Sequence, residues 1–131
     1  MTISRRTALQ LTFASVFGAA APAGAASSQQ FDPAAFEAAQ KAGKSILVDV
    51  SAPWCPVCFV QGLTLRALLV KSRFEDLTVF HVDFDSQKPV LRRFNVQQQA
   101  TLIVFKGAME VGRSVGDPVA TRMEDLLARS L

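Results

Sequence analysis

The pattern of apolar and polar positions divides the chain after residue 30 into four predicted helices and four predicted strands. Strands are indicated by short β-branched runs and by alternation with period two, and helices by period 3.6. Asp32 is a good N-cap, Pro33 suits a first helical position, and Gly43 is a typical helix end. The predicted strands cover residues 46–50, 78–84, 101–106 and 110–115. The predicted helices cover residues 32–43, 56 to about 74, 87–94, and a last segment opened by Pro118.

The same periods predict which side chains form the core. In the helix that starts at residue 56 the predicted inward stripe is Val60, Leu63, Ala67 and Val70. In the last helix the predicted inward residues are Val119, Met123, Leu126 and Leu127. Aromatic residues at strand and helix spacing are usually core residues, and here they are Phe80, Phe84, Phe94 and Phe105.

The order of elements predicts an α/β fold. A strand–helix–strand crossover followed by a terminal hairpin gives a central mixed sheet of about four strands with helices on both faces. With 131 residues, 50% of them apolar, the chain is long enough for one hydrophobic core. We therefore expect a single domain at 26–131.

Residues 1–25 have the pattern of an export signal. Arg5 and Arg6 give a charged start, an apolar run follows, and residues 23–25 are small, as at a cleavage site. The two arginines resemble a twin-arginine signal, and general secretion is the alternative route. Both routes predict a periplasmic or otherwise exported protein, and an uncleaved membrane tether is a further alternative.

Charge excludes one class of partner. The chain carries +3, but without Arg5 and Arg6 its twelve basic residues exceed the eleven acidic ones by one. Such a balance gives no electrostatic footprint for nucleic acid, so we expect no nucleic-acid partner.

The two cysteines carry the strongest chemical signal. Cys55 and Cys58 stand between a predicted strand and a predicted helix, so Cys55 falls at the helix N-terminus. The positive end of the helix dipole there favours a thiolate, which makes Cys55 the expected nucleophile. Cys58, one turn further on, is placed to resolve a mixed disulfide.

Three other interpretations of the cysteine pair are weaker. A metal site needs about four ligands, and His81 is the single additional soft candidate, so no metal is expected. A structural disulfide across so short a loop would constrain the unfolded chain little. Two inert core thiols fit poorly with Pro56 between them, because proline indicates a turn.

The segment from residue 46 to 58 resembles the active-site strand and Trp-Cys-x-x-Cys motif of the thioredoxin superfamily. The resemblance extends over roughly residues 30–131 and includes a glycine, Gly116, after the last strand. It implies a thioredoxin-like fold and makes Asp49 the buried acid that assists proton transfer at the second thiol. A carboxylate in an apolar strand is costly unless paired, and a strand-end position open to solvent is the alternative for Asp49.

The resemblance also implies roles for neighbouring residues. His81 falls where many thioredoxins have a lysine near the acid, so it is a candidate ion-pair partner of Asp49, with a purely structural histidine as the alternative. Trp54 is expected beside the disulfide as part of a docking surface, with simple core packing as its alternative. The remaining substrate-docking positions that the resemblance implies are Pro56, Ala100 and Thr101.

The sequence also departs from the family pattern. Ala100 stands where thioredoxins have a cis-proline, and a cis bond before a non-proline residue is costly, so we expect a trans Gln99–Ala100 bond. We hypothesise that this opens the dithiol to metals or slows release of mixed disulfides. Leu63 replaces a helix-kinking proline, and the usual first strand is missing or very short before Phe31.

Together these features predict an exported, monomeric thiol–disulfide oxidoreductase whose only cofactor-like centre is the Cys55–Cys58 couple. The compact domain favours a reductant of disulfides in exported proteins, recycled by a membrane electron donor; an oxidant is the alternative direction. A different class of function, a binding module for a partner or metal with the cysteines as a redox latch, is favoured by Ala100. A peroxidase lacks support, because no further cysteine exists.

Overall fold

The computed structural model describes Gly18 and residues 26–131. Its sheet has five strands in the order β1-β3-β2-β4-β5. β2 pairs in parallel with β3 and antiparallel with β4, which makes the sheet mixed, as predicted. The expected export signal lies outside the described residues, Gly18 excepted. The strands are β1 (Ser27–Gln30), β2 (Ser45–Ser51), β3 (Thr78–Asp83), β4 (Thr101–Lys106) and β5 (Met109–Val115).

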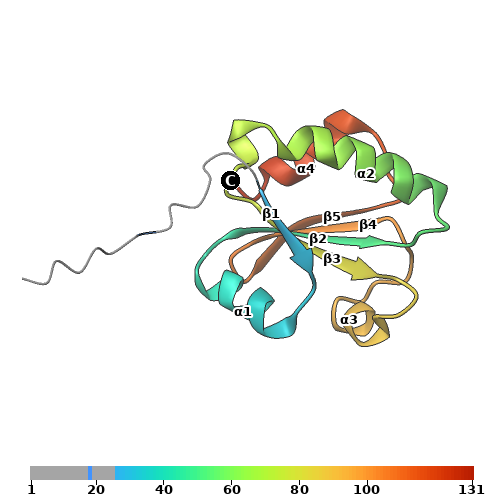
Figure 1. The fold of residues 1–131 in the computed structure, drawn as a ribbon, viewed down its shortest axis with the longest axis horizontal. Coiled ribbons are helices and arrows are strands. Elements are labelled where there is room, and N and C mark those ends of the chain that lie inside the picture. The colour runs from blue at the N-terminus through green and yellow to red at the C-terminus, as the bar shows by residue number, and fades with distance from the viewer. Residues whose placement is uncertain (1–17, 19–25) are drawn as a thin grey trace, which may run out of the picture.

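Helices cover both faces of the sheet, as Figure 1 shows. α2 and α4 lie on one face, and α1 and α3 lie on the other. The helices are α1 (Pro33–Lys41), α2 (Pro56–Leu69), α3 (Lys88–Arg93) and α4 (Ala120–Ala128), with a short 3-10 turn η1 (Ser72–Phe74) after α2.

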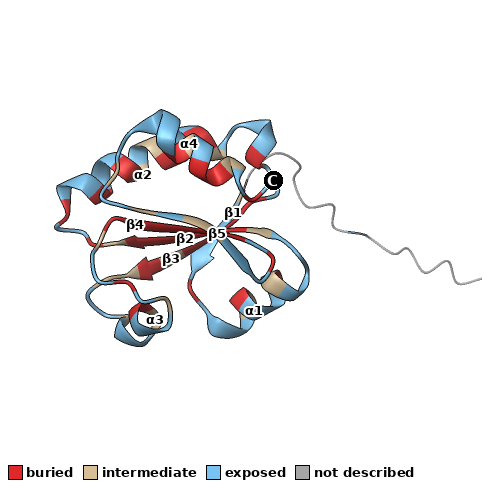
Figure 2. Cartoon of the chain, turned by 180° about the vertical axis from the view of Figure 1, so that it is seen from behind, coloured by how far each residue is buried: buried red, intermediate tan, exposed pale blue. Residues whose placement is uncertain are grey.

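The sheet separates two hydrophobic clusters, because successive side chains of a strand point to opposite faces. In β2, Leu47 packs with α2 and α4, whereas Ile46 and Val48 pack with α1 and α3. Figure 2 shows the buried central strands between the two helical layers. Phe80 and Phe105 are buried and Phe84 and Phe94 are partly buried against the same cluster, as predicted.

Strand β1 adds a fifth strand to the four that were expected. It is only four residues long and every one of them is exposed. Its partner is β3, with which it pairs in parallel at the edge of the sheet. The expectation of a very short first strand is confirmed, and its polar sequence explains why periodicity did not reveal it.

The predicted inward face of α2 is wrong. Val60, Leu63, Ala67 and Val70 are exposed, and the buried residues of the helix are Cys58, Gln61, Leu65 and Leu68. Because α2 carries apolar residues on both sides, its composition does not select a face. The position of Cys58 sets the phase of the helix, and residues three, seven and ten positions later share its inward side.

Two helix boundaries also differ from the prediction. α2 ends at Leu69 rather than near Phe74, which belongs to the separate turn η1. α4 begins at Ala120, after Val119 in extended conformation, so Val119 is 38% exposed instead of facing the core. Asp32 accepts a hydrogen bond from the Ala35 N–H at 2.9 Å, which confirms the start of α1.

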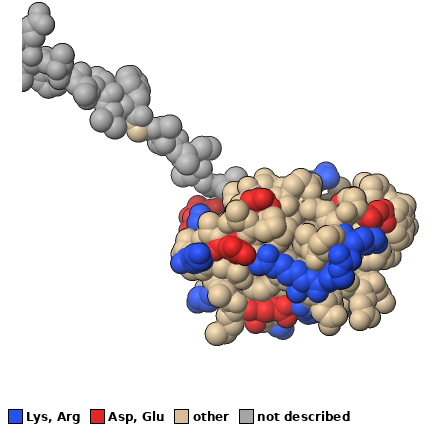
Figure 3. All heavy atoms as spheres, turned by 90° about the horizontal axis from the view of Figure 1, so that it is seen from below, with Lys and Arg blue, Asp and Glu red and all other residues tan. Residues whose placement is uncertain are grey.

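Basic side chains gather on the side of the molecule that carries α1 and α3, where Lys and Arg form a band in Figure 3. α3 contributes three basic residues and no acidic one. One of them, Arg93, lies over the rings of Phe31, Phe36 and Phe94. This guanidinium therefore covers the aromatic cluster as well as adding charge to the surface.

The face reversal of α2 gives a direct stability prediction. Replacement of buried Leu65 by alanine should lower the free energy of unfolding by about 2 to 5 kcal/mol, because it leaves a cavity. Replacement of Leu63, 48% exposed on the same helix, should change it by only about 0.5 kcal/mol. Urea unfolding of the two variants measures both values. Equal losses would contradict the observed orientation of α2.

Candidate active site

The cysteine pair lies at the junction between β2 and α2. Cys55 is the N-cap of α2, and its Sγ accepts a hydrogen bond from the Cys58 N–H at 3.1 Å. The two cysteines form a disulfide with a Cα–Cα distance of 5.2 Å. Pro56 occupies the first turn, where its missing N–H costs no helical hydrogen bond. The helix N-terminus thus directs its dipole and one N–H donor at Cys55 Sγ, as predicted.

The disulfide is covered on most sides. Cys55 is 3% and Cys58 8% exposed, and they form a small cluster with Ala52 and Ala100. Phe84 packs against this cluster from the end of β3. The disulfide therefore lies in a largely buried, apolar environment.

Trp54 directly precedes Cys55 in the chain. It is 58% exposed, and its indole Nε1 donates a hydrogen bond to Asp85 Oδ2 at 2.8 Å. The docking role of Trp54 stays a prediction; the structure shows a surface residue whose ring is held by Asp85. Asp85 was not predicted as a site residue, although its place in a polar turn directly after β3 was a usable signal.

Asp83 builds the turn that carries Asp85. Its Oδ1 accepts hydrogen bonds from the backbone N–H groups of Asp85 and Ser86 and from the Ser86 hydroxyl. The bonds from Ser86, the backbone one foremost, hold the pKa of Asp83 below its ordinary value. The ionised carboxylate therefore orders the turn that positions the Trp54 ring.

Asp49 lies beneath the disulfide, on the α2 face of the sheet. It is 8% exposed and lines a hollow of about 260 Å³ together with Cys58, Arg66 and His81. Oδ2 of Asp49 lies 3.2 Å from Nδ1 of His81, its direct partner in the register of β2 and β3. The structure therefore brings together the predicted acid, the second cysteine and the candidate ion-pair partner.

Ala100 occupies the place opposite the disulfide that the resemblance assigned to a proline. Among the described residues every peptide bond is trans, so the expectation for Gln99–Ala100 is confirmed. Ala100 has φ +59°, in the left-handed region that L residues rarely adopt. It is 3% exposed, and its methyl group packs with the cysteines.

Gln61 holds the Ala100 loop in this conformation. Its Nε2 donates to the carbonyl oxygens of Ala100 at 3.2 Å and Asp117 at 2.9 Å, and the Gly116 N–H also donates to Ala100 O. Gln61 is 1% exposed, and its Oε1 has no hydrogen-bond partner among the described residues. Sequence analysis missed this residue. A glutamine in an otherwise apolar run of α2 was the available signal.

Thr101, like Ala100, is a predicted docking residue that the structure buries. It is 2% exposed, and its hydroxyl donates to the Gln98 carbonyl oxygen at 2.7 Å. This hydrogen bond closes the turn before β4, so the side chain of Thr101 shapes the loop from inside.

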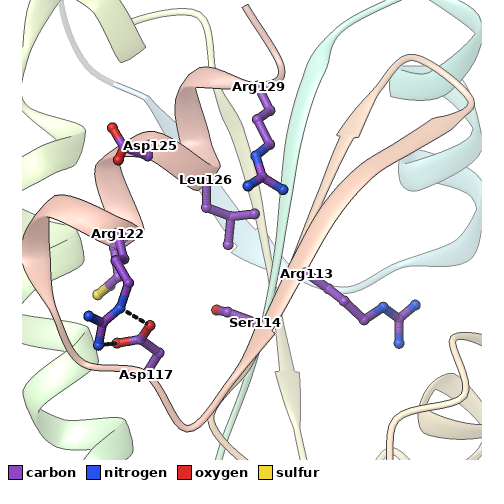
Figure 4. Close-up of a pocket in the computed structure, with 8 residues that line it drawn as sticks. Arg113, Ser114, Asp117, Arg122, Asp125, Leu126 and Arg129 are labelled. Carbon is purple, nitrogen blue, oxygen red and sulfur yellow. Dashed lines mark hydrogen bonds and ion pairs between the residues drawn. The ribbon is translucent and has the colours of Figure 1, made fainter.

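A second hollow lies between β5 and α4, away from the cysteine pair. Figure 4 shows Arg122 paired with Asp117 at its edge, with Ser114 and Arg129 lining it. The pair lowers the pKa of Asp117 and raises that of Arg122. None of the predicted site residues lines this hollow.

In the part of the chain that the structure describes, no group of three metal-binding side chains occurs. No helix in that part has the length and apolar character needed to cross a membrane.

Residues 27–129 match the family model of thioredoxin. The chain belongs to the thioredoxin family. A Thioredoxin H-type of Fagopyrum esculentum is 32% identical over 92 residues, which cover 70% of this chain and 74% of that relative. Thioredoxin H2-2 of Oryza sativa subsp. japonica is 34% identical over 73 residues, 56% of this chain and 53% of the relative, so the match spans about half the length of that protein.

A solved structure supports the same thioredoxin assignment. The crystal structure of Trxlp from Edwardsiella tarda has a TM-score of 0.75 and 44% sequence identity, and the match covers 77% of this chain and 98% of that chain. Together with the Cys55–Cys58 disulfide, the thioredoxin family indicates a thiol–disulfide oxidoreductase.

The conformation of Ala100 predicts how this thioredoxin-family loop responds to substitution. Proline cannot adopt φ +59°, so Ala100→Pro should lower the free energy of unfolding by about 2 kcal/mol or more. Ala100→Gly, the matched control, should stay within about 1 kcal/mol of the parent, since glycine adopts this conformation freely. Chemical denaturation measures both. A proline variant as stable as the parent would show that the loop has another conformation.

The lowered pKa of Asp83 predicts a pH dependence. Its contribution to stability is present above the unfolded value near 3.8 and is lost as the pH falls through the lower folded pKa. Asp83→Asn should therefore reduce stability at pH 7, and the difference in stability from the parent should narrow as the pH falls below 3.8. Trp54 is the single tryptophan, so its fluorescence reports the transition. Asp76→Asn, at an exposed position, is the control. A stability difference between Asp83→Asn and the parent that does not vary with pH would refute the role of the ionised Asp83 carboxylate.

Proposed function

We propose that this protein is an exported thiol–disulfide oxidoreductase that reduces disulfides of envelope proteins through Cys55 and Cys58. The observation that carries the proposal is the cysteine pair at the N-terminus of α2, with Cys55 Sγ accepting the Cys58 N–H. The same donor and the helix dipole would stabilise a Cys55 thiolate once the disulfide is reduced.

The reaction has two exchange steps. In the first, the Cys55 thiolate attacks a substrate disulfide, a Cys55–substrate bond forms, and the departing sulfur leaves as a thiolate that takes up a proton. In the second, Cys58 loses its proton, its sulfur attacks Cys55 Sγ, and the Cys55–substrate bond breaks. The substrate leaves reduced, and the protein ends in the disulfide state that the structure shows.

Reduction of exported proteins is proposed on three grounds. Residues 1–25 have the pattern of an export signal, with a twin-arginine start. The domain has the compact size of a thioredoxin, and an oxidising compartment would require a membrane electron donor to return the couple to its dithiol form. In this proposal the protein acts as a monomer and uses neither a cofactor nor a nucleic-acid partner.

A binding module is the second candidate. The observation that favours it is Ala100, whose buried methyl group and doubly hydrogen-bonded carbonyl restrict the loop facing the disulfide. In this alternative the disulfide acts as a latch for a partner or metal and reacts once per molecule, whereas an enzyme turns over.

Cysteine variants separate the steps of the proposed reaction. Cys55→Ser should abolish turnover of insulin disulfides with dithiothreitol as donor, because it removes the nucleophile. Cys58→Ser should retain the first step and accumulate a mixed disulfide that mass spectrometry detects. Leu63→Ala, an exposed change on α2, serves as the control and should keep full activity. Stoichiometric reaction of the unmodified protein without turnover would support the latch instead.

The reduction potential of the couple decides the direction of the proposed reaction. The couple is equilibrated with dithiothreitol buffers, and the fraction oxidised is followed by Trp54 fluorescence. A reductant should have a reduction potential of about −270 mV. A reduction potential of about −120 mV would identify an oxidant that introduces disulfides.

A further inference from the structure

A hollow of about 380 Å³ lies on the sheet face that α3 covers, next to the cysteine pair. Phe84 joins the two, because it packs against the buried cysteine cluster and also lines the hollow. The rest of the lining comes from α3 and the loop after it, and includes Lys88, Arg92, Asn95 and Gln97. A substrate that reaches the disulfide across Phe84 therefore also meets this surface.

The charged side chains that line this hollow are all basic, and they lie on the side of the molecule where Figure 3 shows the band of Lys and Arg. Lys88 and Arg92 are both exposed. Among the described residues neither of them forms an ion pair, whereas the adjacent Arg93 pairs with Glu37 at 3.7 Å. Lys88 and Arg92 are therefore available to a negatively charged partner.

The two cations have defined places on α3. The Lys88 Nζ lies 4.5 Å from the centroid of the Phe84 ring, a cation–π contact that holds its charge at the border of the cysteine cluster. Arg92 follows four positions later in the same helix. Residues with this spacing are neighbours on one side of a helix, with Cβ atoms about 5 to 6 Å apart. The hollow thus presents a pair of positive charges at a known separation.

Two acidic side chains after β3 leave the charge of the hollow positive, because neither lines it. Asp83 accepts hydrogen bonds from the backbone of Asp85 and Ser86, and Asp85 accepts the indole N–H of Trp54. Hydrogen bonds from Ser86 lower the pKa of Asp83 most, and the charge of Lys88 contributes least. These carboxylates order the turn that carries Trp54 instead of occupying the cations of α3.

We infer that Lys88 and Arg92 select substrates whose disulfide is flanked by acidic residues. The inference rests on the proposed function and specifies its substrate class. Residues two positions apart in an extended peptide point to one side and lie about 6 to 7 Å apart, which is close to the spacing of the two cations. An acidic-x-acidic segment beside the substrate cysteine therefore matches them, and the exposed amides of Asn95 and Gln97 offer further donors to its carboxylates.

Exposed charges of this kind act on the encounter between the partners more than on the chemical step. They raise the second-order rate constant of the exchange, and salt weakens the effect, because the screening length falls from about 30 Å at 0.01 M to about 3 Å at 1 M. The reactivity of Cys55 is set by α2 and stays the same for every disulfide. The contribution of α3 is selectivity.

The test compares three synthetic peptides of equal length, each with one internal disulfide and with Glu-x-Glu, Gln-x-Gln or Lys-x-Lys beside the first cysteine. The dithiol protein is mixed with excess peptide, and its oxidation is timed by Trp54 fluorescence. At low salt the acidic peptide should react about three- to tenfold faster than the neutral one, and the basic peptide should react more slowly than both. These differences should vanish at about 1 M salt.

Variants of α3 connect this preference to its two cations. Lys88→Gln and Arg92→Gln should each lower the rate constant for the acidic peptide about two- to fivefold and leave that for the neutral peptide unchanged. Lys88→Glu combined with Arg92→Glu should reverse the preference, so that the basic peptide reacts faster than the acidic one. A loss of folding cannot produce such a reversal, because it would slow all three peptides.

Lys44→Gln is the matched control. It removes one positive charge from an exposed position directly before β2, whereas the cysteines follow the other end of this strand. All three rate constants should stay at the values of the parent.

The outcomes separate the inference from the function on which it rests. Equal rates for the three peptides at low salt would overturn the role of α3 and leave the proposed oxidoreductase intact. An acidic preference that survives in the combined charge-reversal variant would do the same. No oxidation of the dithiol protein by any of the three peptides would overturn the proposed function itself.

Discussion

The position of β2 between a parallel and an antiparallel neighbour is the constraint on which the site depends. Its register with β3 places Asp49 opposite His81, and its register with β4 places Val50 opposite Thr101. The pairing with β3 places Asp49 in the hollow that Cys58 lines. The pairing with β4 brings Ala100 to the end of β2, where the cysteine loop begins. A one-residue slip of β2 would turn Asp49 to the opposite face, so the apolar pattern of this strand also fixes the geometry of the chemistry.

The parts of the site that the sequence predicted are those that follow from local order. Cys55 directly follows a buried strand and precedes a helix, so its position at a helix N-terminus needs no long-range information. Asp49 stands out because a carboxylate interrupts an apolar run. Gln61 and Asp85 were missed because their hydrogen bonds to Ala100 and Trp54 span 39 and 31 residues of sequence. A polar residue in a helix or a turn carries no local sign of such a contact.

The error in α2 has a similar physical origin. A helix that is apolar on two sides leaves its orientation to the elements that it packs against, and here Cys58 and Leu65 fix the inward face while Val60 and Leu63 remain exposed. For such a helix, sequence periodicity shows that apolar residues are present but does not show which side is buried.

The shortest strand shows how fold and chemistry are coupled. β1 buries none of its four residues, so hydrophobic burial contributes little to holding it at the sheet edge. What holds it is backbone pairing with β3 and the contact between Ser28 and His81. That contact ends on the carboxylate that shares a hollow with Cys58. The edge strand is therefore linked through the side chains of Ser28, His81 and Asp49 to the hollow that Cys58 lines.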